Sequence, residues 1–317
     1  MKLKEVLLSH DAVIFVGSGL SKAEPPDYRC GYPSWPDLIK ALCIACMGCI
    51  PHDDNWNGWG DPEKLIELAE DARQASRSKY DEVIRRIFCD TPKVATPEVY
   101  RYLARLNAKS YVTTNYDSLL RNALEDIGVQ RDVHVYPKLQ HASRVSAGGL
   151  FHIHGYVGTI DDNMYSEIVL SKEEFDMAYC ENRPLVRLWD TMLDENCVVF
   201  IGTSLSDPST RSMLDKYKER SSALSLNGSY RRRDSFVLIG MDEQTVEVAL
   251  SWRQADIDRL NARKTQEYCT QIGLVPVLYD KEDPNHSGLL HLLKEIAPRP
   301  SLKSFNPIFG NQGDGLQ

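Results

Sequence analysis

The stretch AVIFVGSGLS, residues 12–21, determines how the rest of the chain is interpreted. Its first five residues are apolar and mostly β-branched, which is typical of a strand buried on both faces of a parallel sheet. Gly17, Ser18 and Gly19 follow directly, and this composition predicts a tight turn that leads into a helix. A doubly wound α/β domain usually begins in this way.

Further apolar runs recur along the chain with helix-length stretches between most of them. They cover residues 110–113, 150–153, 167–170, 198–201, 236–239 and 274–278. Strands that alternate with helical stretches favour a parallel arrangement. We therefore expect an α/β fold with a mostly parallel sheet.

About ninety residues separate the first two predicted strands, far more than one crossover helix needs. Helices are expected there over residues 36–49, 62–78, 80–88 and 96–106. Asp61 and Thr96 each precede a proline, a pattern typical of a helix cap followed by proline at the first helical position. We expect one domain over residues 1–298 with a helical insertion at about 36–107, and a flexible tail over residues 299–317.

Composition excludes several classes of protein. With 317 residues, 42% hydrophobic and 26% charged, the chain is typical of a folded globular protein. Its net charge of −8 gives no broad basic surface, so direct binding to nucleic acid is not expected. We identify no signal peptide and no apolar run of about 18 residues, so we expect a cytoplasmic protein without a membrane span, with its cysteines reduced.

The glycine turn at residues 17–19 is open to two interpretations. Glycines let a backbone approach a phosphate closely, and the helix that follows would present N–H groups to it. The dinucleotide fingerprint, however, requires a third glycine where Lys22 stands, and the Gly-Lys-Ser/Thr of a P-loop is absent. The turn therefore indicates either nucleotide binding or a structural feature of the α/β fold.

Polar side chains follow the second predicted strand. Ligands bind beyond the carboxyl ends of the strands in open α/β sheets. Asn115 and Asp117 are two residues apart, so in extended chain their side chains would point the same way. Asp117 is equally well explained as the cap of a helix that begins near Ser118, whereas Asn115 stands too early for that role.

Two further strand exits carry chemically useful residues. His152 and His154 end the strand at 150–153, and we favour His154 because Gly155 is expected to open space beside it. The strand at 198–201 leads into small and hydroxylic residues, Gly202, Thr203 and Ser204. Together, these exits predict a common pocket at one edge of the sheet.

Taken in order, these motifs resemble those of the sirtuins. The matching segments are residues 17–21 (GSGLS), 114–117 (TNYD), 154–155 (HG) and 202–205 (GTSL). The resemblance spans residues 12 to about 208, and the later strands fit the rest of a Rossmann-like fold. Each motif is short, but the ordered set is specific.

The chain departs from the zinc-dependent sirtuins in the region after the His-Gly motif. Those proteins carry two Cys-x-x-Cys pairs there, whereas this region offers only Cys180 and Cys197, so neither a zinc ribbon nor a metal is expected. Cys43, Cys46 and Cys49 are interpreted as small residues on an apolar helix. The segment at residues 31–38, the helical insertion, and residues 168–171 and 206–208 look like those of a zinc-free sirtuin-like branch found in bacterial antiphage defence, whose members typically hydrolyse NAD.

The resemblance implies an NAD glycohydrolase that splits NAD into nicotinamide and ADP-ribose and depletes the cell of NAD. It implies that Asn115 orients the nicotinamide ribose and a water molecule and that His154 accepts a proton. The residues implied in binding NAD are Gly17, Ser18, Gly19 and Ser21 at the pyrophosphate, Asp117 at the nicotinamide side, and Gly202, Thr203 and Ser204 at the phosphate or adenosine ribose.

Two other functions stay open on the same residues. One is a non-catalytic scaffold that binds NAD or ADP-ribose for a partner such as a HerA-type ATPase, and the other is a zinc-free protein deacylase. The helical insertion and polar tail exceed what an NAD site requires. We therefore expect a homo-oligomer whose activity is controlled by assembly or by a defence partner.

Overall fold

β1 (Ala12–Val16) lies in the middle of a seven-stranded sheet whose order is β3-β4-β2-β1-β5-β6-β7. Every strand pairing in this sheet is parallel. The other strands are β2 (Ser110–Thr113), β3 (Val133–Val135), β4 (Gly149–His152), β5 (Cys197–Ile201), β6 (Phe236–Met241) and β7 (Val275–Asp280). The predicted α/β fold with a mostly parallel, Rossmann-like sheet is confirmed.

This computed structural model describes residues 3–22, 32–52, 56–89, 96–139, 145–158, 167–180, 183–205, 207–225, 234–241, 263–281 and 287–298. The expected tail over residues 299–317 lies outside the described residues. The helices are α1 (Leu3–Leu8), η1 (Ser18–Lys22), α2 (Trp35–Met47), η2 (Asn57–Gly60), α3 (Pro62–Ala75), α4 (Arg77–Phe88), α5 (Glu98–Arg105), α6 (Leu119–Asp126), α7 (Lys172–Ala178), α8 (Pro184–Glu195), α9 (Pro208–Ser225) and α11 (Ser287–Ile296).

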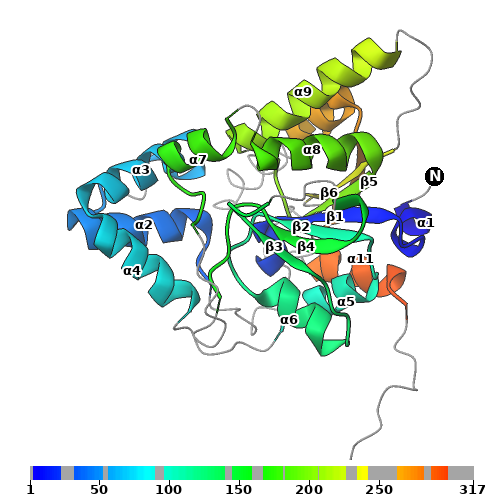
Figure 1. Cartoon of the computed structure of the whole chain (residues 1–317), viewed down its shortest axis with the longest axis horizontal. Helices are drawn as coiled ribbons and strands as arrows, with labels where there is room; N and C mark the ends of the chain where they lie inside the picture. Colours follow the sequence, from blue (N-terminus) through cyan, green and yellow to red (C-terminus); the bar gives the residue numbers. More distant parts are fainter. Residues whose placement is uncertain are drawn as a thin grey trace, which may run out of the picture.

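Helices cover both faces of the sheet. Residues of α1, α5, α6 and α11 share one buried cluster with the sheet, and residues of α8, α9 and the helical segment 263–272 share another. In Figure 1, α8 and α9 lie above the strands while α5, α6 and α11 lie below them. The central strands are therefore buried on both faces, which explains why all five residues of β1 are apolar.

The helices α2, α3 and α4 form a third core of their own, at one end of the sheet (Figure 1). Leu42, Ala69 and Tyr80 are fully buried in it, and Leu170 from the segment after β4 joins them. By contrast, α5 packs on the sheet beside α6 as the crossover helix into β2. The part of the predicted insertion that packs apart from the sheet is thus α2 to α4.

Two local predictions of helix starts have different outcomes. At α3, the Asp61 carboxylate accepts a hydrogen bond from the N–H of Glu63 at 3.0 Å and Pro62 is the first helical residue, as predicted. At α5, Pro97 itself is the N-cap and the helix begins at Glu98, so the prediction that Thr96 caps this helix is wrong.

One predicted strand is absent, and one strand of the sheet was not predicted. Residues 167–170 form no strand; Val169 donates one backbone hydrogen bond to the carbonyl of His154 at 2.9 Å, and Leu170 is buried against the insertion. The run is apolar because Ile168 and Leu170 pack in the core of the insertion, while Val169 packs in the cluster that the sheet shares with α8 and α9. β3 is a three-residue, half-buried strand at the edge of the sheet, too short to be detected by its periodicity.

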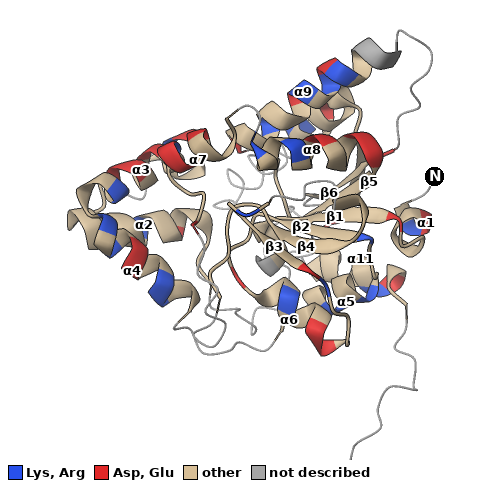
Figure 2. Cartoon of the chain, viewed as in Figure 1, with Lys and Arg blue, Asp and Glu red and all other residues tan. Residues whose placement is uncertain are grey.

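Acidic and basic residues are mixed along the helices. Figure 2 shows Lys and Arg interspersed with Asp and Glu along α8 and α9. Among the described residues, no helix combines the length and the apolar character needed to cross a membrane.

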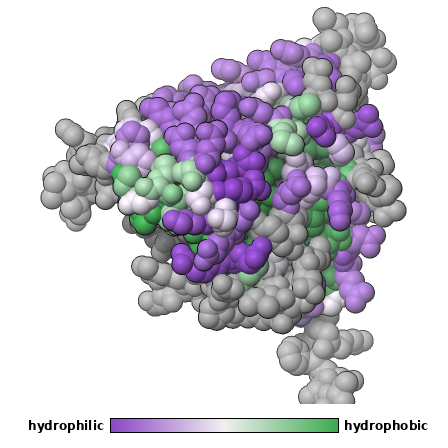
Figure 3. Space-filling view, turned by 60° about the vertical axis from the view of Figure 1, so that its left-hand side comes forward, coloured by the Kyte–Doolittle hydropathy of each residue, from purple (hydrophilic) through white to green (hydrophobic). Residues whose placement is uncertain are grey.

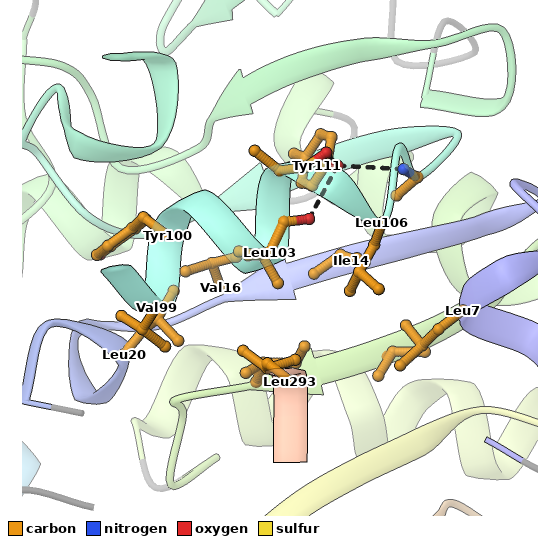
Figure 4. Packing of buried hydrophobic residues seen from close by; sticks show 14 of the residues in the cluster. Leu7, Ile14, Val16, Leu20, Val99, Tyr100, Leu103, Leu106, Tyr111 and Leu293 are labelled. Atoms are coloured by element: carbon orange, nitrogen blue, oxygen red, sulfur yellow. Dashed lines mark hydrogen bonds between the residues drawn. The ribbon is translucent and has the colours of Figure 1, made fainter. Parts of the chain in front are cut away.

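A buried tyrosine joins α5 to β2. The Tyr111 hydroxyl accepts a hydrogen bond from the N–H of Ala108 at 3.1 Å and lies 3.3 Å from the carbonyl of Ala104. Figure 4 shows Tyr111 above Leu103 and Leu106, next to the apolar packing around Ile14 and Val16. Because water does not reach this site, the hydroxyl supplies the partner that the Ala108 N–H needs.

We predict that Tyr111→Phe lowers the free energy of unfolding by about 1–3 kcal/mol, because it leaves the buried N–H of Ala108 without a partner. Urea denaturation followed by circular dichroism measures this change. Tyr268→Phe is the matched control: its hydroxyl bonds Asp215 at 3.1 Å in an exposed position, so its loss should change stability by less than ~0.5 kcal/mol. Equal effects of the two changes would contradict the structural role of Tyr111.

Candidate active site

The exits of β1 and β5 meet in a direct contact between backbones. The N–H of Gly17 donates to the carbonyl of Ile201 at 3.0 Å, and the N–H of Gly19 donates to the carbonyl of Gly202 at 2.7 Å. From β1 the chain leads to β2 on one side of it and later to β5 on the other, so this contact lies at the topological switch point of the sheet. Ligands of open α/β sheets bind in the crevice at such a point.

Glycine is required on both sides of this contact. A Cβ atom on Gly17 would lie 2.6 Å from the carbonyl oxygen of Gly202, and one on Gly19 would lie 2.7 Å from it. Gly202 has φ +65° and a Cβ there would lie 2.3 Å from the backbone nitrogen of Leu20. The glycines therefore let two segments of the chain approach each other, whether or not a phosphate also binds here.

A cavity of about 490 Å³ opens at this edge of the sheet, within the ~300–1,000 Å³ range of small-molecule sites. It brings together nine of the ten residues predicted from the sequence: Gly17, Ser18, Gly19, Asn115, Asp117, His154, Gly202, Thr203 and Ser204. The tenth, Ser21, belongs to η1, and its side chain lies outside the described part of the chain. The common pocket expected from the strand exits is present.

The Asn115 side chain lines this cavity in a fixed orientation. Its Nδ2 donates to the Tyr100 hydroxyl at 3.2 Å and to the carbonyl of Gly17 at 3.4 Å. Oδ1 is buried and has no hydrogen-bond partner among the described residues. A buried polar atom without a partner costs stability, so Oδ1 is an acceptor that a ligand or water in the cavity could satisfy.

His154 also lines the cavity, and its other contacts hold the ring in place. Nε2 lies 2.7 Å from the Tyr179 hydroxyl, and the rings of Phe175 and Tyr179 meet the imidazole edge to face. Burial lowers the pKa of His154 to about 3, so the ring is neutral at pH 7. A neutral imidazole can accept a proton from a reacting group.

Gly155 has a different role from the one expected. Its φ is +93°, and a Cβ atom there would lie 2.2 Å from the carbonyl oxygen of Glu167. The space beside His154 is therefore filled by the chain at residues 167–168. Glycine is needed here for the backbone turn and for this close contact.

His152 lies behind the site and does not line the cavity. Its Nδ1–H donates to the backbone carbonyl of Asn115 at 3.1 Å, and the residue is completely buried. Burial lowers its pKa to about 4. Of the two histidines on this strand exit, His154 is the one available to a ligand, while His152 holds the backbone of Asn115.

Asp117 contributes to the start of α6, which is one of the two roles that the sequence left open, and its role toward a ligand stays a prediction. Its Oδ1 accepts the N–H of Leu119 at 2.9 Å in the first turn of α6, and the residue also lines the cavity. Burial raises the pKa of its carboxyl to about 6, against the opposing effect of its hydrogen bonds with Leu119 and its own backbone.

Several lining residues were not predicted from the sequence. Tyr32, Phe88 and Tyr116 form an aromatic wall in which successive ring centroids lie 5.4 and 5.6 Å apart. Asp207 lies before α9, where its Oδ1 accepts the N–H of Thr210 at 2.8 Å. Asp207 could have been predicted, because an aspartate before a proline is typical of a helix start. Phe88 reaches the site from α4, and nothing in the sequence around it indicates a site residue.

Cysteines and metal ligands do not gather at the site. Within the ranges that the structure describes, no group of three or more His, Cys, Asp or Glu could hold a metal ion. Cys43 is buried in α2 and its pKa is raised to about 11 by burial, whereas Cys49 lies beyond that helix and is exposed. Cys43 therefore fits the expected role of a small core residue, and Cys49 does not.

We predict that Asp117 makes the protein less stable as pH rises from about 4 to 7. Its carboxyl has a pKa of about 6 in the folded chain against an ordinary value of 3.8, so the folded state holds a proton that the unfolded state has already lost. Asp117→Asn can keep the bond to Leu119. The change that this substitution causes in the free energy of unfolding should be about 1–3 kcal/mol more favourable at pH 7 than at pH 4. Urea titrations of both proteins at the two pH values measure the difference; the same effect at both would contradict the prediction.

Comparison with known proteins agrees with this geometry. Residues 109–259 match the model of a SIR2-like domain. NAD(+) hydrolase ThsA of Bacillus cereus strain MSX-D12 is 28% identical over 219 residues, and the protein of that name from Cytobacillus dafuensis is 26% identical over 225 residues. Both alignments cover 68% of this chain but 41% of the relative, so the chain spans about two fifths of the length of these curated relatives.

The matched domain begins just before β2 and includes the exits that carry Asn115, His154 and Gly202. The parallel sheet and the crevice at its switch point are what the resemblance to sirtuins implied. Residues 109–259 of this chain are therefore similar to a SIR2-like domain.

Proposed function

We propose that this chain is an NAD glycohydrolase that splits NAD into nicotinamide and ADP-ribose. The observation that carries the proposal is the presence, in one cavity, of Asn115, whose Oδ1 has no partner among the described residues, and of the neutral imidazole of His154. The names of the relatives, which describe NAD(+) hydrolases, support this assignment.

The reaction suits these two groups. The bond from the ribose C1′ to the nicotinamide nitrogen breaks, and its electron pair neutralises the charge on the pyridinium ring. Nicotinamide thus leaves as a neutral molecule that needs no acid. A water oxygen then bonds to C1′, and the proton that it loses passes to His154 and on to solvent.

Asn115 would orient the ribose and the attacking water. Its Oδ1 is an acceptor held rigid by the bonds that Nδ2 makes to Tyr100 and Gly17, so little freedom is lost when a hydroxyl donates to it. We assign Asp117 to the nicotinamide side of the cavity. The segments around Ser18 and Thr203 would meet the pyrophosphate and the adenosine ribose.

The aromatic wall of Tyr32, Phe88 and Tyr116 would limit the access of bulk water. Phe88 comes from α4, so the helical insertion itself contributes to the closure of the cavity. Exclusion of bulk water strengthens electrostatic interactions with the oxocarbenium-like transition state of glycosidic bond cleavage.

We predict that Asn115→Ala and His154→Ala each reduce nicotinamide release from NAD by about 100-fold or more, because each removes a group that acts on the reacting atoms. Chromatography of the products measures the loss, with and without an acylated peptide to test for deacylation. Asn122→Ala is the control for the amide: its Nδ2 bonds the Ser118 hydroxyl at 3.2 Å on α6, away from the cavity.

Comparison with His152→Ala separates chemistry from folding. Both histidines are buried, so each replacement should lower the melting temperature, but only His154 lines the cavity, so His154→Ala should cost far more activity. Full activity in a folded Asn115→Ala protein would overturn the proposed site. Binding of NAD without turnover by the wild type would instead favour a scaffold.

We further propose that the activity serves antiphage defence by NAD depletion and depends on self-association or on a partner such as a HerA-type ATPase. Uncontrolled NAD hydrolysis would harm the cell that makes the enzyme. Figure 3 turns the side of the insertion forward and shows a hydrophobic patch within a mainly hydrophilic face. Ile44 on α2 and Ile50 after it are 52% and 38% exposed, and exposed apolar side chains favour an interface.

We predict that the specific activity changes on dilution as an oligomer dissociates. Light scattering combined with activity measurements across a dilution series tests this. A monodisperse monomer with full, concentration-independent activity would contradict self-association. Ile44→Asp should shift dissociation to higher protein concentration, because burying a carboxylate in an apolar interface is unfavourable.

A further inference from the structure

His154 has one clear side-chain partner, and it comes from outside the four motifs that define the site. The Tyr179 hydroxyl lies 2.7 Å from Nε2, one residue beyond the end of α7. Nδ1 has no hydrogen-bond partner among the described residues. The ring therefore has one nitrogen that the protein holds and one that can meet a substrate.

We propose that Tyr179 is the positioning residue of His154: its hydroxyl oxygen accepts the Nε2–H bond and so keeps Nδ1 free to take a proton in NAD hydrolysis. This inference rests on the proposed function. A neutral imidazole carries one proton on either nitrogen, and a tyrosine hydroxyl can accept from Nε2–H or donate to Nε2; we assign the proton to Nε2 and the hydroxyl as the acceptor. Only the form with the proton on Nε2 leaves Nδ1 as a base.

The same bond stabilises the protonated state that the reaction creates. When Nδ1 takes the proton from the attacking water, the ring becomes a cation in a buried site, which burial alone disfavours. Nε2–H then donates to the Tyr179 oxygen as a charge-assisted hydrogen bond, stronger than the neutral one. Tyr179 keeps its own proton throughout, and the proton on Nδ1 leaves to solvent once the products separate.

Tyr179 is suited to this role because α7 is firmly attached to the insertion. Glu174 accepts the N–H groups of Leu170 and Ser171 at 3.1 and 2.9 Å and the Tyr80 hydroxyl at 3.3 Å. Arg73 of α3 pairs with the same carboxylate at 3.4 Å. In Figure 2, α3 and α7 lie side by side with basic and acidic residues together.

The attachment continues from α7 to the imidazole. Phe175 follows Glu174 directly, and its ring contacts that of His154 with centroids 5.2 Å apart. Tyr179 lies one turn later, and its backbone N–H donates to the carbonyl of Phe175 at 3.0 Å. The hydroxyl is thus held at a fixed position relative to the sheet, as the positioning of a tautomer requires.

Tyr179→Phe tests the proposal, since it removes the hydroxyl and keeps the ring contacts. We expect kcat for nicotinamide release to fall about 10- to 100-fold, a part of the ~10²- to 10⁴-fold that a general base supplies, with KM for NAD changed less than about twofold. A purely structural role of Tyr179 would lower the melting temperature, and kcat would not fall selectively while KM stays nearly unchanged. Tyr268→Phe, which loses an exposed hydroxyl bond to Asp215, should keep wild-type kinetics.

Nitrogen-15 NMR of the histidine rings gives a second readout that needs no turnover. With the His154 signal assigned from a His154→Gln protein, we expect the Nε2–H form in the wild type and a mixture of both forms in Tyr179→Phe. An unchanged kcat, or an imidazole signal unaffected by Tyr179→Phe, would overturn the role of Tyr179. If the wild type hydrolyses no NAD, the proposed function fails by itself, and the NMR comparison still decides whether Tyr179 sets the tautomer.

Discussion

The contact between Gly17, Gly19 and Gly202 is the constraint on which the site depends. Two parallel strands that exit side by side would normally be separated by side chains at their ends. Here the backbones bond directly, with Gly19 N–H only 2.7 Å from the carbonyl of Gly202. This contact lies at the centre of the sheet edge formed by the carboxyl ends of the strands. The cavity beside it is lined by residues at the ends of β2, β4, β6 and β7.

The polar groups of the site are held from behind by a buried hydrogen-bond network. The N–H of Asn115 donates to the Thr113 hydroxyl at 3.0 Å, and that hydroxyl donates to the carbonyl of Val16 at 3.0 Å. His152 holds the carbonyl of Asn115, and Tyr100 holds its amide. The residue is thus fixed through its backbone and its side chain, so that Oδ1 is presented with little reorganisation.

Much of the architecture was accessible from the sequence because β-branched runs followed by small polar residues mark the ends of buried parallel strands. Asn115 and Gly202 could be predicted for this reason, whereas His154 was favoured over His152 because of Gly155, which has a different role in the structure. The run at residues 167–170 misled because Leu170 is buried against helices, which have the same need for apolar residues as a sheet. Phe88 and Tyr179 could not be predicted, since their positions depend on tertiary packing of the insertion.

The core of the helical insertion includes Val157, Ile168 and Leu170, which follow β4 and His154 in the chain. The insertion therefore shares a core with the rest of the chain and is not an independent unit that could be removed. Excision of α2 to α4 would expose these apolar side chains and take away the wall that Phe88 provides. In evolutionary terms, the insertion and the segment after His154 must change together, so variation in one should be accompanied by compensating variation in the other.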